Sequence, residues 1–170
     1  MFVLCACLAA SRTFAQAPAL PTPDIHYVPT SNGVADAMLT LAHTTAADVV
    51  YDLGSGDGRI VIAAAKKFAA RGVGIELDPD LINTARKNAR KAGVADKVSF
   101  VQGDLFKADL SPATVITLYL SNSINFRLRD SLQKLKPGTR IVSHRFTFGD
   151  WKPEAEEHLQ GTSIYLWTIK

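Results

Sequence analysis

Apolar runs and amphipathic runs alternate along most of the chain. Residues 48–53 and 71–77 are short runs rich in β-branched side chains, and residues 58–70 between them carry apolar positions at helical spacing. Short, continuously apolar runs are typical of buried parallel strands, and a helix that connects two of them completes a β-α-β unit. The pattern therefore predicts a parallel sheet with helices packed against it.

The same alternation continues to the end of the chain. Pro79 after Asp78 begins another helical run, which Gly93 ends. The remaining expected elements are a helix at residues 122–135 and strands at residues 97–101, 114–120, 139–146 and 163–169. Together these elements predict an α/β fold with a doubly wound, mostly parallel sheet and an antiparallel C-terminal strand.

The first thirty residues differ from the rest. Residues 1–17 are largely apolar and resemble a secretory signal peptide, which predicts export or association with a membrane. No Lys or Arg precedes the apolar run, so a cytoplasmic protein with a misassigned start codon is the alternative. Residues 18–30 contain four prolines and predict an extended tether, and residues 31–170 are expected to form the folded domain, beginning with an amphipathic helix.

Composition narrows the class of protein. A chain of 170 residues that is 47% hydrophobic suits one domain with a buried core. A net charge of +3 is far from the clustered positive face that nucleic-acid binding usually requires, so a nucleic-acid partner is not expected. Cys5 and Cys7 both lie in the signal-like segment and the histidines are scattered, so no metal site is expected either.

The turn after the first expected strand carries the candidate chemistry. It reads Asp52-Leu53-Gly54-Ser55-Gly56-Asp57-Gly58. Its three glycines would let a ligand approach the backbone closely, but Arg59 stands where a dinucleotide-binding loop has its last glycine. The carboxylates of Asp52 and Asp57 would repel a pyrophosphate and attract an ammonium group. The loop therefore favours S-adenosylmethionine, which carries an amino-acid end and no phosphate, over a nicotinamide dinucleotide.

Two further carboxylates follow the next two strands. Glu76, with Leu77 after it, ends the second strand, where a carboxylate can accept hydrogen bonds from ribose hydroxyls. Asp104, with Leu105 after it, follows the third strand and is a candidate acceptor for the adenine amino group. Helix capping and turn formation are the alternative roles for these acidic residues. Since parallel strands end at one edge of a sheet, all the candidates converge on a single crevice.

S-adenosylmethionine carries its methyl group on a sulfonium, and transfer of that group is an in-line displacement. Alignment and exclusion of water therefore matter more than any one catalytic group. Tyr119, at the end of the fourth expected strand, is the candidate to orient or deprotonate an amine; its alternative is an aromatic ring that fills space beside the cofactor. Residues 118–121 lack the Asn-Pro-Pro-aromatic type of sequence found in methyltransferases of nucleic-acid amino groups. His144 is a candidate residue at the entrance to the substrate site, because a histidine can titrate near neutral pH; a structural role is the alternative.

The loop at residues 52–58, with Glu76 and Asp104, resembles the cofactor motifs of the seven-strand class I methyltransferases. The resemblance implies a Rossmann-like fold, binding of S-adenosylmethionine by the loop and Glu76, and enzymatic methyl transfer. A non-catalytic sensor or partner module that binds S-adenosylmethionine is the alternative function.

A narrower resemblance is carried by residues 27–30, 51–61 and 141–146. They are similar to the small lysine methyltransferases that modify the ATP synthase c subunit and the adenine nucleotide translocase, and to their bacterial relatives. This implies transfer to a protein lysine or a small amine, and a Tyr27 that contacts the cofactor as part of a lid. A plain linker is the alternative for that segment. The glutamate-rich residues 152–160, where the family has its sixth strand, do not predict a strand.

Overall fold

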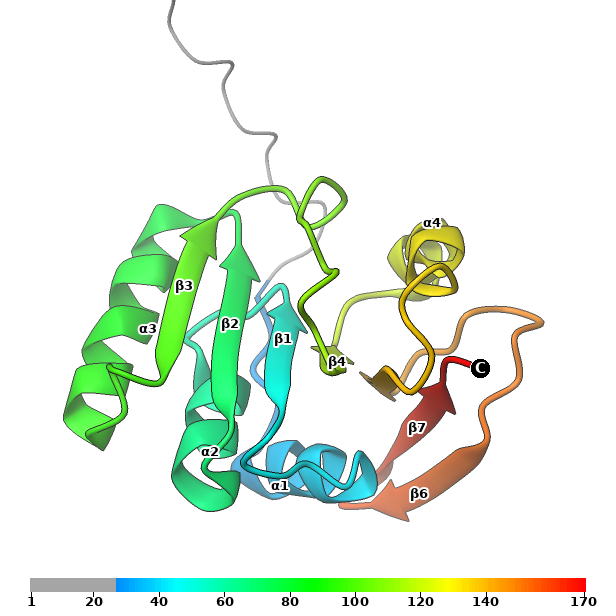
Figure 1. Ribbon diagram of the computed structural model, residues 1–170, viewed down its shortest axis with the longest axis horizontal. Helices are drawn as coiled ribbons and strands as arrows, with labels where there is room; N and C mark the ends of the chain where they lie inside the picture. Colours follow the sequence, from blue (N-terminus) through cyan, green and yellow to red (C-terminus); the bar gives the residue numbers. More distant parts are fainter. Residues whose placement is uncertain (1–26) are drawn as a thin grey trace, which may run out of the picture.

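A seven-stranded sheet organises residues 27–170, the part of the chain that the computed structural model describes (Figure 1). The strands are β1 Val49–Leu53, β2 Arg71–Glu76, β3 Val98–Gln102, β4 Val115–Leu118, β5 Arg140–His144, β6 Ala155–Leu159 and β7 Thr162–Thr168. The helices are α1 Asn32–Leu41, α2 Arg59–Phe68, α3 Pro79–Ala92 and α4 Asn122–Leu132.

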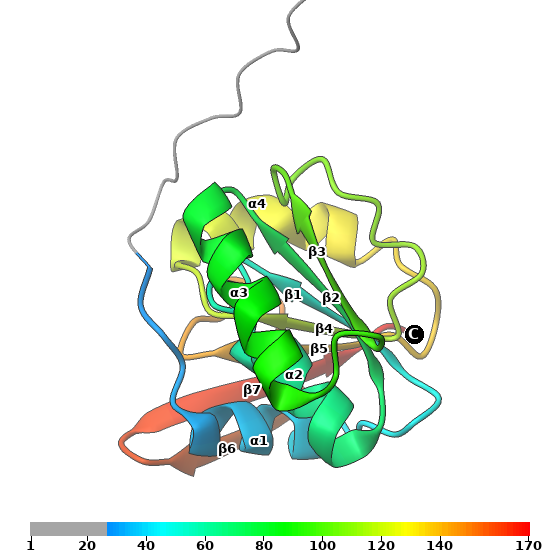
Figure 2. The ribbon, with the colours of Figure 1, turned by 90° about the vertical axis from the view of Figure 1, so that its left-hand side faces the viewer.

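The strand order is β3-β2-β1-β4-β5-β7-β6. Strands β1 to β5 are parallel, whereas β7 is antiparallel to both β5 and β6. Helices α1, α2 and α3 cover one face of the sheet and α4 covers the other (Figures 1 and 2). The predicted doubly wound sheet with an antiparallel C-terminal strand is confirmed.

The chain reverses its direction of growth between β1 and β4. Leu53 at the end of β1 pairs with Leu118 at the end of β4. In open α/β sheets ligands bind outside the carboxyl ends of the strands at such a reversal. The fold therefore places the residues that follow β1 and β4 in one crevice.

Local signals explain where the helices begin and end. The Asp78 side chain accepts a hydrogen bond from the Asp80 amide, Pro79 opens α3, and Gly93 closes it with a φ of 72°. Ser31 caps α1 in the same way by accepting from the Val34 amide. These ends lie where the sequence predicted them.

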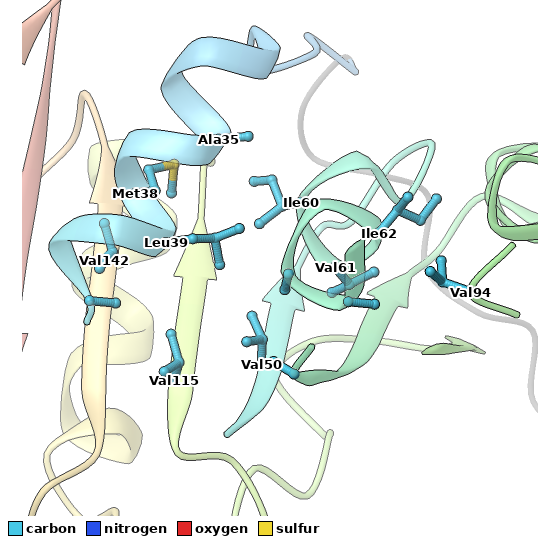
Figure 3. Packing of buried hydrophobic residues seen from close by; sticks show 14 of the residues in the cluster. Ala35, Met38, Leu39, Val50, Ile60, Val61, Ile62, Val94, Val115 and Val142 are labelled. Atoms are coloured by element: carbon cyan, nitrogen blue, oxygen red, sulfur yellow. The ribbon is translucent and has the colours of Figure 1, made fainter. Parts of the chain in front are cut away.

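The core has one apolar cluster on each face of the sheet. Met38 and Leu39 of α1 join Ile60 of α2 and Val115 and Val142 of the sheet (Figure 3). Burial of such side chains contributes about 1.5–3 kcal/mol each relative to exposure. The packing fixes α1 and α2 on the sheet. It thereby holds the chain segments that lead into these two helices beside the crevice.

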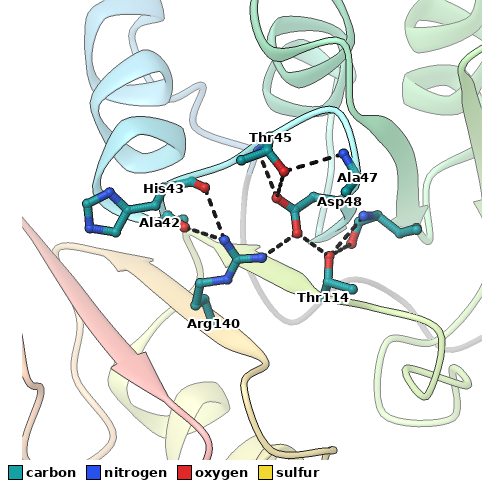
Figure 4. Close-up of polar contacts among 8 residues, drawn as sticks. Ala42, His43, Thr45, Ala47, Asp48, Thr114 and Arg140 are labelled. Atoms are coloured by element: carbon teal, nitrogen blue, oxygen red, sulfur yellow. Dashed lines mark hydrogen bonds and ion pairs between the residues drawn. The ribbon is translucent and has the colours of Figure 1, made fainter.

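A buried polar network closes the other end of the strands (Figure 4). The Asp48 carboxylate accepts hydrogen bonds from Thr114 Oγ1 at 2.7 Å and the Thr45 amide at 2.7 Å, and it pairs with Arg140. Burial raises the pKa of Asp48, but these bonds and the Arg140 charge outweigh burial and hold it below its usual range. Arg140 also donates to the Ala42 carbonyl at 2.8 Å. The network joins α1 to β1, β4 and β5 and has no place in the crevice.

The expectation that residues 152–160 form no strand is wrong. β6 pairs with β7 from Ala155 opposite Leu166 to Leu159 opposite Thr162. Ala155 and Leu159 pack against the core while the glutamates between them face solvent, which an edge strand tolerates and which protects it from further pairing. Gln160 and Gly161 both have positive φ and form the two-residue turn of a hairpin.

The signal-like segment at residues 1–17 and most of the tether lie outside the described residues. Residues 27–30 of the tether have no regular secondary structure. Within residues 27–170, no helix is long and apolar enough to cross a membrane.

Candidate active site

The glycine loop needs its glycines for two reasons. Gly54, Gly56 and Gly58 have φ values of 75°, 53° and 80°, in the left-handed region that other residues rarely adopt. Neighbours also crowd the loop, because a Cβ on Gly56 would lie 2.2 Å from the Tyr27 ring and one on Gly54 would lie 2.9 Å from Leu120. The loop is therefore a closely packed turn between β1 and α2, in which Gly54 is exposed and Gly56 and Gly58 are buried.

Asp52 is the buried acid of the site. It is 3% exposed, and its Oδ1 accepts a hydrogen bond from Thr117 Oγ1 at 2.7 Å. Burial raises the pKa of Asp52 to about 7, the Thr117 hydrogen bond opposes the shift, and the charges of Glu76 and Asp57 add to it. With Gly54 and Ser55, Asp52 lines a pocket at the end of β1. A cation placed there would stabilise the ionised carboxylate.

Asp57 has a partner within the chain. Arg59 binds it through two nitrogens, Nε to Oδ1 at 2.9 Å and Nη2 to Oδ2 at 2.7 Å. Burial raises the pKa of Asp57, but the Arg59 hydrogen bonds and charge outweigh burial and lower it, so the group stays ionised with its charge offset. Of the two aspartates predicted to attract an ammonium group, Asp52 is thus the one that the structure presents to the pocket without a cationic partner.

Arg59 also holds the segment at residues 27–30 against the loop. Its Nη1 donates to the Thr30 carbonyl at 2.8 Å, and its Nη2 lies 3.5 Å from the Tyr27 hydroxyl. The Tyr27 ring covers Gly56, and the whole segment lines the same pocket as Asp52. Residues 27–30 therefore lie over the loop, and whether they act as a lid or as a linker stays a prediction.

Glu76 connects the ends of β1 and β2. Its Oε2 accepts from the Gly56 amide at 2.8 Å, and its Oε1 accepts from the amides of Leu77 at 2.8 Å and Asp78 at 3.0 Å. An ionised carboxylate has about four lone-pair sites, so three amide bonds leave it able to accept a hydroxyl as well. Glu76 is therefore in the place predicted for ribose binding.

Asp104 lies beside Glu76 and also shapes its own turn. The Gly103 amide donates to the Glu76 carbonyl at 2.9 Å, which brings the two loops together. Asp104 Oδ1 accepts from the Phe106 amide at 3.0 Å, and its Oδ2 lies 3.9 Å from Lys107 Nζ. Leu105 packs against the apolar cluster on the face of the sheet that α4 covers. Asp104 thus has the turn-forming role that was its alternative, and its predicted contact with the adenine amino group stays a prediction.

Tyr119 lines two cavities. One is the pocket of Asp52, and the other is a groove bordered by His144 and Gln160. Its ring centroid lies 3.9 Å from that of His144 and 6.1 Å from that of Phe146. Among residues 27–170 no hydrogen bond holds the Tyr119 hydroxyl. Its predicted role in orienting an amine stays a prediction, and its position is shared by both cavities.

His144 is largely buried, with an exposure of 6%. Its Nδ1 lies 3.2 Å from Thr30 Oγ1 and its Nε2 lies 3.0 Å from Thr162 Oγ1. Burial and, to a smaller extent, the Arg145 charge lower the pKa of His144, so the imidazole is neutral near pH 7. His144 therefore has a structural role, because it joins residues 27–30 to β7; it also borders the groove, and its role toward a substrate stays a prediction.

Other residues take structural positions or were missed. Trp167 donates from Nε1 to the Trp151 carbonyl at 3.0 Å within an aromatic cluster, which is a packing role.

The roles of Arg59 and Thr117 were not predicted. The spacing of Arg59 from Asp57 is a local signal, whereas Thr117 meets Asp52 across 65 residues of sequence. In the described part of the chain no cluster of His, Cys, Asp or Glu could hold a metal ion.

The site matches a known family. The sequence profile of the ANTKMT methyltransferase domain matches residues 52–155, which include the glycine loop, Glu76, Asp104 and Tyr119. The chain belongs to this methyltransferase family. The site is thus that of an S-adenosylmethionine-dependent methyltransferase, and the class I fold and the cofactor predicted from the loop are confirmed.

Relatives of this methyltransferase carry different names. It is 42% identical to a protein-lysine N-methyltransferase of Saccharolobus islandicus, over 86% of this chain and 95% of that one. It is 36% identical to a Xenopus laevis enzyme named as a lysine N-methyltransferase of the ATP synthase c subunit, over 89% of this chain and 66% of that one.

A solved structure is also similar to this methyltransferase. It is described as an RNA methyltransferase from Salinibacter ruber in complex with S-adenosyl-L-homocysteine. The identity is 59%, the TM-score is 0.82, and the match covers 84% of this chain and 94% of that one. All three relatives are thus named as methyltransferases, and they differ in the acceptor named.

Proposed function

We propose that this methyltransferase transfers the methyl group to the side-chain amine of a protein lysine. The observation that carries the proposal is the position of Tyr119, which lines both the Asp52 pocket and a neighbouring groove. A relative matched over 95% of its length is a protein-lysine N-methyltransferase, which supports lysine as the acceptor.

The residues present fit S-adenosylmethionine. Asp52 would hold the ammonium of its methionine part, and Gly54 and Ser55 of the loop line the same pocket. Glu76 would hold the ribose, and Asp104 and Leu105 would contact the adenine. When bound, this cofactor supplies a methyl group on a sulfonium, which a nucleophile can accept.

The chain itself supplies alignment and exclusion of water. Tyr119 would orient the acceptor nitrogen through its unpaired hydroxyl. Tyr27, held on Gly56, would cover the cofactor, because Arg59 ties the lid segment to the loop at the Thr30 carbonyl. Water kept out of the pocket strengthens the attraction between Asp52 and a cation.

RNA is the competing acceptor, because the related Salinibacter structure is described as an RNA methyltransferase. Enzymes that act on a base hold it by stacking between aromatic or apolar side chains. Here the Tyr119 ring is already covered by His144, with ring centroids 3.9 Å apart. This contact favours a slender amine over a nucleobase at Tyr119.

The test is the destination of a labelled methyl group. The protein is incubated with S-adenosylmethionine labelled in its methyl group and with cell lysate, and the product is then treated with protease or with nuclease. We expect label that protease releases and nuclease leaves in place. Label in nuclease-sensitive material would overturn the lysine proposal, and tight donor binding without any labelled product would point to a sensor.

A further inference from the structure

We propose that the groove between the β6–β7 turn and the turn after β5 is the acceptor-binding site, and that it admits the lysine side chain as an uncharged amine. The inference rests on the proposed function and adds to it a location and a binding chemistry. Figure 2 shows the β6–β7 turn beside the start of α1, where one side of the groove is formed.

The groove has the dimensions of a ligand site. Its volume is about 460 Å³, within the range of about 300–1,000 Å³ that is common for small-molecule sites. Its lining includes Tyr119, His144, Arg145, Gln160, Thr162 and Ser163. Because Tyr119 also lines the pocket of Asp52, a side chain that enters the groove reaches the wall shared with the cofactor site.

One wall of the groove is held in place by the first helix. Ser31, the cap of α1, donates a hydrogen bond from Oγ to Gln160 Oε1 at 2.7 Å. Gly33 allows this approach, since a Cβ there would lie 2.3 Å from Gln160 Nε2. The β6–β7 turn is therefore fixed against α1, and the groove is formed before an acceptor arrives.

The opposite wall is a strained turn held by a buried amide. The Phe146 amide donates to the His144 carbonyl at 2.9 Å, which puts Arg145 at the centre of a three-residue turn with a φ of 70°. Asn125 of α4 is fully buried and donates to Ser143 Oγ and to the Phe146 carbonyl, both at 3.1 Å. The turn keeps His144 and Phe146 against Tyr119.

Arg145 is the non-glycine residue whose positive φ has no ordinary explanation. The others in the described chain are His43 and Ala69, which follow helices, and Gln160, which lies in a hairpin turn. Helix ends and such hairpins accommodate positive φ routinely. Strain without that explanation is concentrated at functional sites, where the surrounding structure maintains it.

The charge of the groove selects the form of the amine. Among the described residues that line it there is no carboxylate, and the charged side chain is the exposed Arg145. A lysine ammonium gains no counterion there and is repelled by the guanidinium, so the pKa of the entering amine falls. Its proton passes to water, and the nitrogen keeps the lone pair that a methyl acceptor needs.

Blocking the groove tests the location. In a protein with Cys5→Ser and Cys7→Ser, a Ser163→Cys variant is reacted with a bulky maleimide, and a Lys91→Cys variant on the exposed surface of α3 is the matched control. We expect modified Ser163→Cys to lose total methyl transfer into lysate macromolecules by about a hundredfold, because the acceptor cannot reach its aligned position. Calorimetry with S-adenosylhomocysteine should show the same affinity for both modified variants. Retained transfer, or an equal loss of cofactor affinity, would overturn the proposal.

Arg145→Gln tests the charge. Removing the guanidinium should move the acid limb of the pH profile of kcat/KM, measured with partially purified acceptor protein, upward by roughly half a unit. An unchanged profile would contradict the uncharged-amine proposal. The maleimide experiment measures methyl transfer to any acceptor, whereas the protease and nuclease treatments identify the class of acceptor. The location of the acceptor site and the identity of the acceptor are therefore tested separately.

Discussion

At the scale of single residues, Asp52 is set by its burial. Its carboxyl keeps a proton up to about pH 7 in the folded protein, whereas the ordinary value is 3.8. Between these values the folded state binds more protons than the unfolded state, so stability falls as pH rises through that window. A cationic ligand beside the carboxylate would reverse this cost.

Asp52→Asn should therefore flatten the pH dependence of stability. The ligand-free parent should lose up to about 4 kcal/mol between pH about 4 and pH about 8, since each pKa unit is worth about 1.4 kcal/mol. The variant should lose less over the same range and should bind S-adenosylmethionine more weakly. Urea unfolding across this range and calorimetry would measure both effects, and identical pH slopes would contradict the buried-acid account.

Tyr119→Phe separates orientation from packing. The phenyl ring keeps the contacts with His144 and Phe146 but lacks the hydroxyl proposed to orient the acceptor. We expect kcat to fall about a hundredfold, the lower end of general acid–base effects, with cofactor affinity unchanged. A change in kcat below about threefold would leave Tyr119 as a packing residue, and Tyr119→Ala would then show the cost of losing the ring.

At the scale of elements, the turn after β5 depends on α4. Asn125→Ala removes the two hydrogen bonds that this side chain donates to the turn, so we expect a loss of stability of about 1–3 kcal/mol and a higher KM for the acceptor. Asn122→Ala, an exposed asparagine of the same helix, is the control. If Asn125→Ala lost stability without any change in KM, the turn would not belong to the acceptor site.

The lid is the second element with a testable role. Tyr27→Ala removes the ring that covers Gly56, and it should raise the Kd for S-adenosylhomocysteine about tenfold, equivalent to about 1.4 kcal/mol. Phe126→Ala truncates an exposed aromatic on α4 and should leave this Kd unchanged. Equal Kd values for the two variants would identify residues 27–30 as a linker.

At the scale of the whole molecule, the elements with strong local patterns were predictable. The glycine loop and the capped helix α3 carry their own signals, so their positions agree with the structure. The strand β6 was missed because its residues are mostly charged and its pairing with β7 is decided by an edge position that no short window reveals.

The site was predictable in its acids and unpredictable in their partners. Asp52, Glu76 and Asp104 follow successive strands, so topology alone brings them together. The pairings of Thr117 with Asp52 and of Asn125 with the turn after β5 join distant segments, and they depend on the final register of the sheet. Such contacts leave no pattern in the sequence.

The location of the protein stays a prediction. The expected signal peptide at residues 1–17 lies outside the described residues, and a cytoplasmic protein is its alternative. Fractionation of expressing cells, with mass spectrometry of the N-terminus of the mature protein, would decide between export and retention.

The most direct test of the account is the chemical identity of the methylated product. Labelled protein from the lysate reaction is hydrolysed to amino acids, and the labelled residue is identified by chromatography and mass spectrometry. A protein-lysine methyltransferase should yield methylated lysine, and the yield should fall in parallel in modified Ser163→Cys and in Tyr119→Phe. Label on any other amino acid, or on a nucleoside, would contradict it.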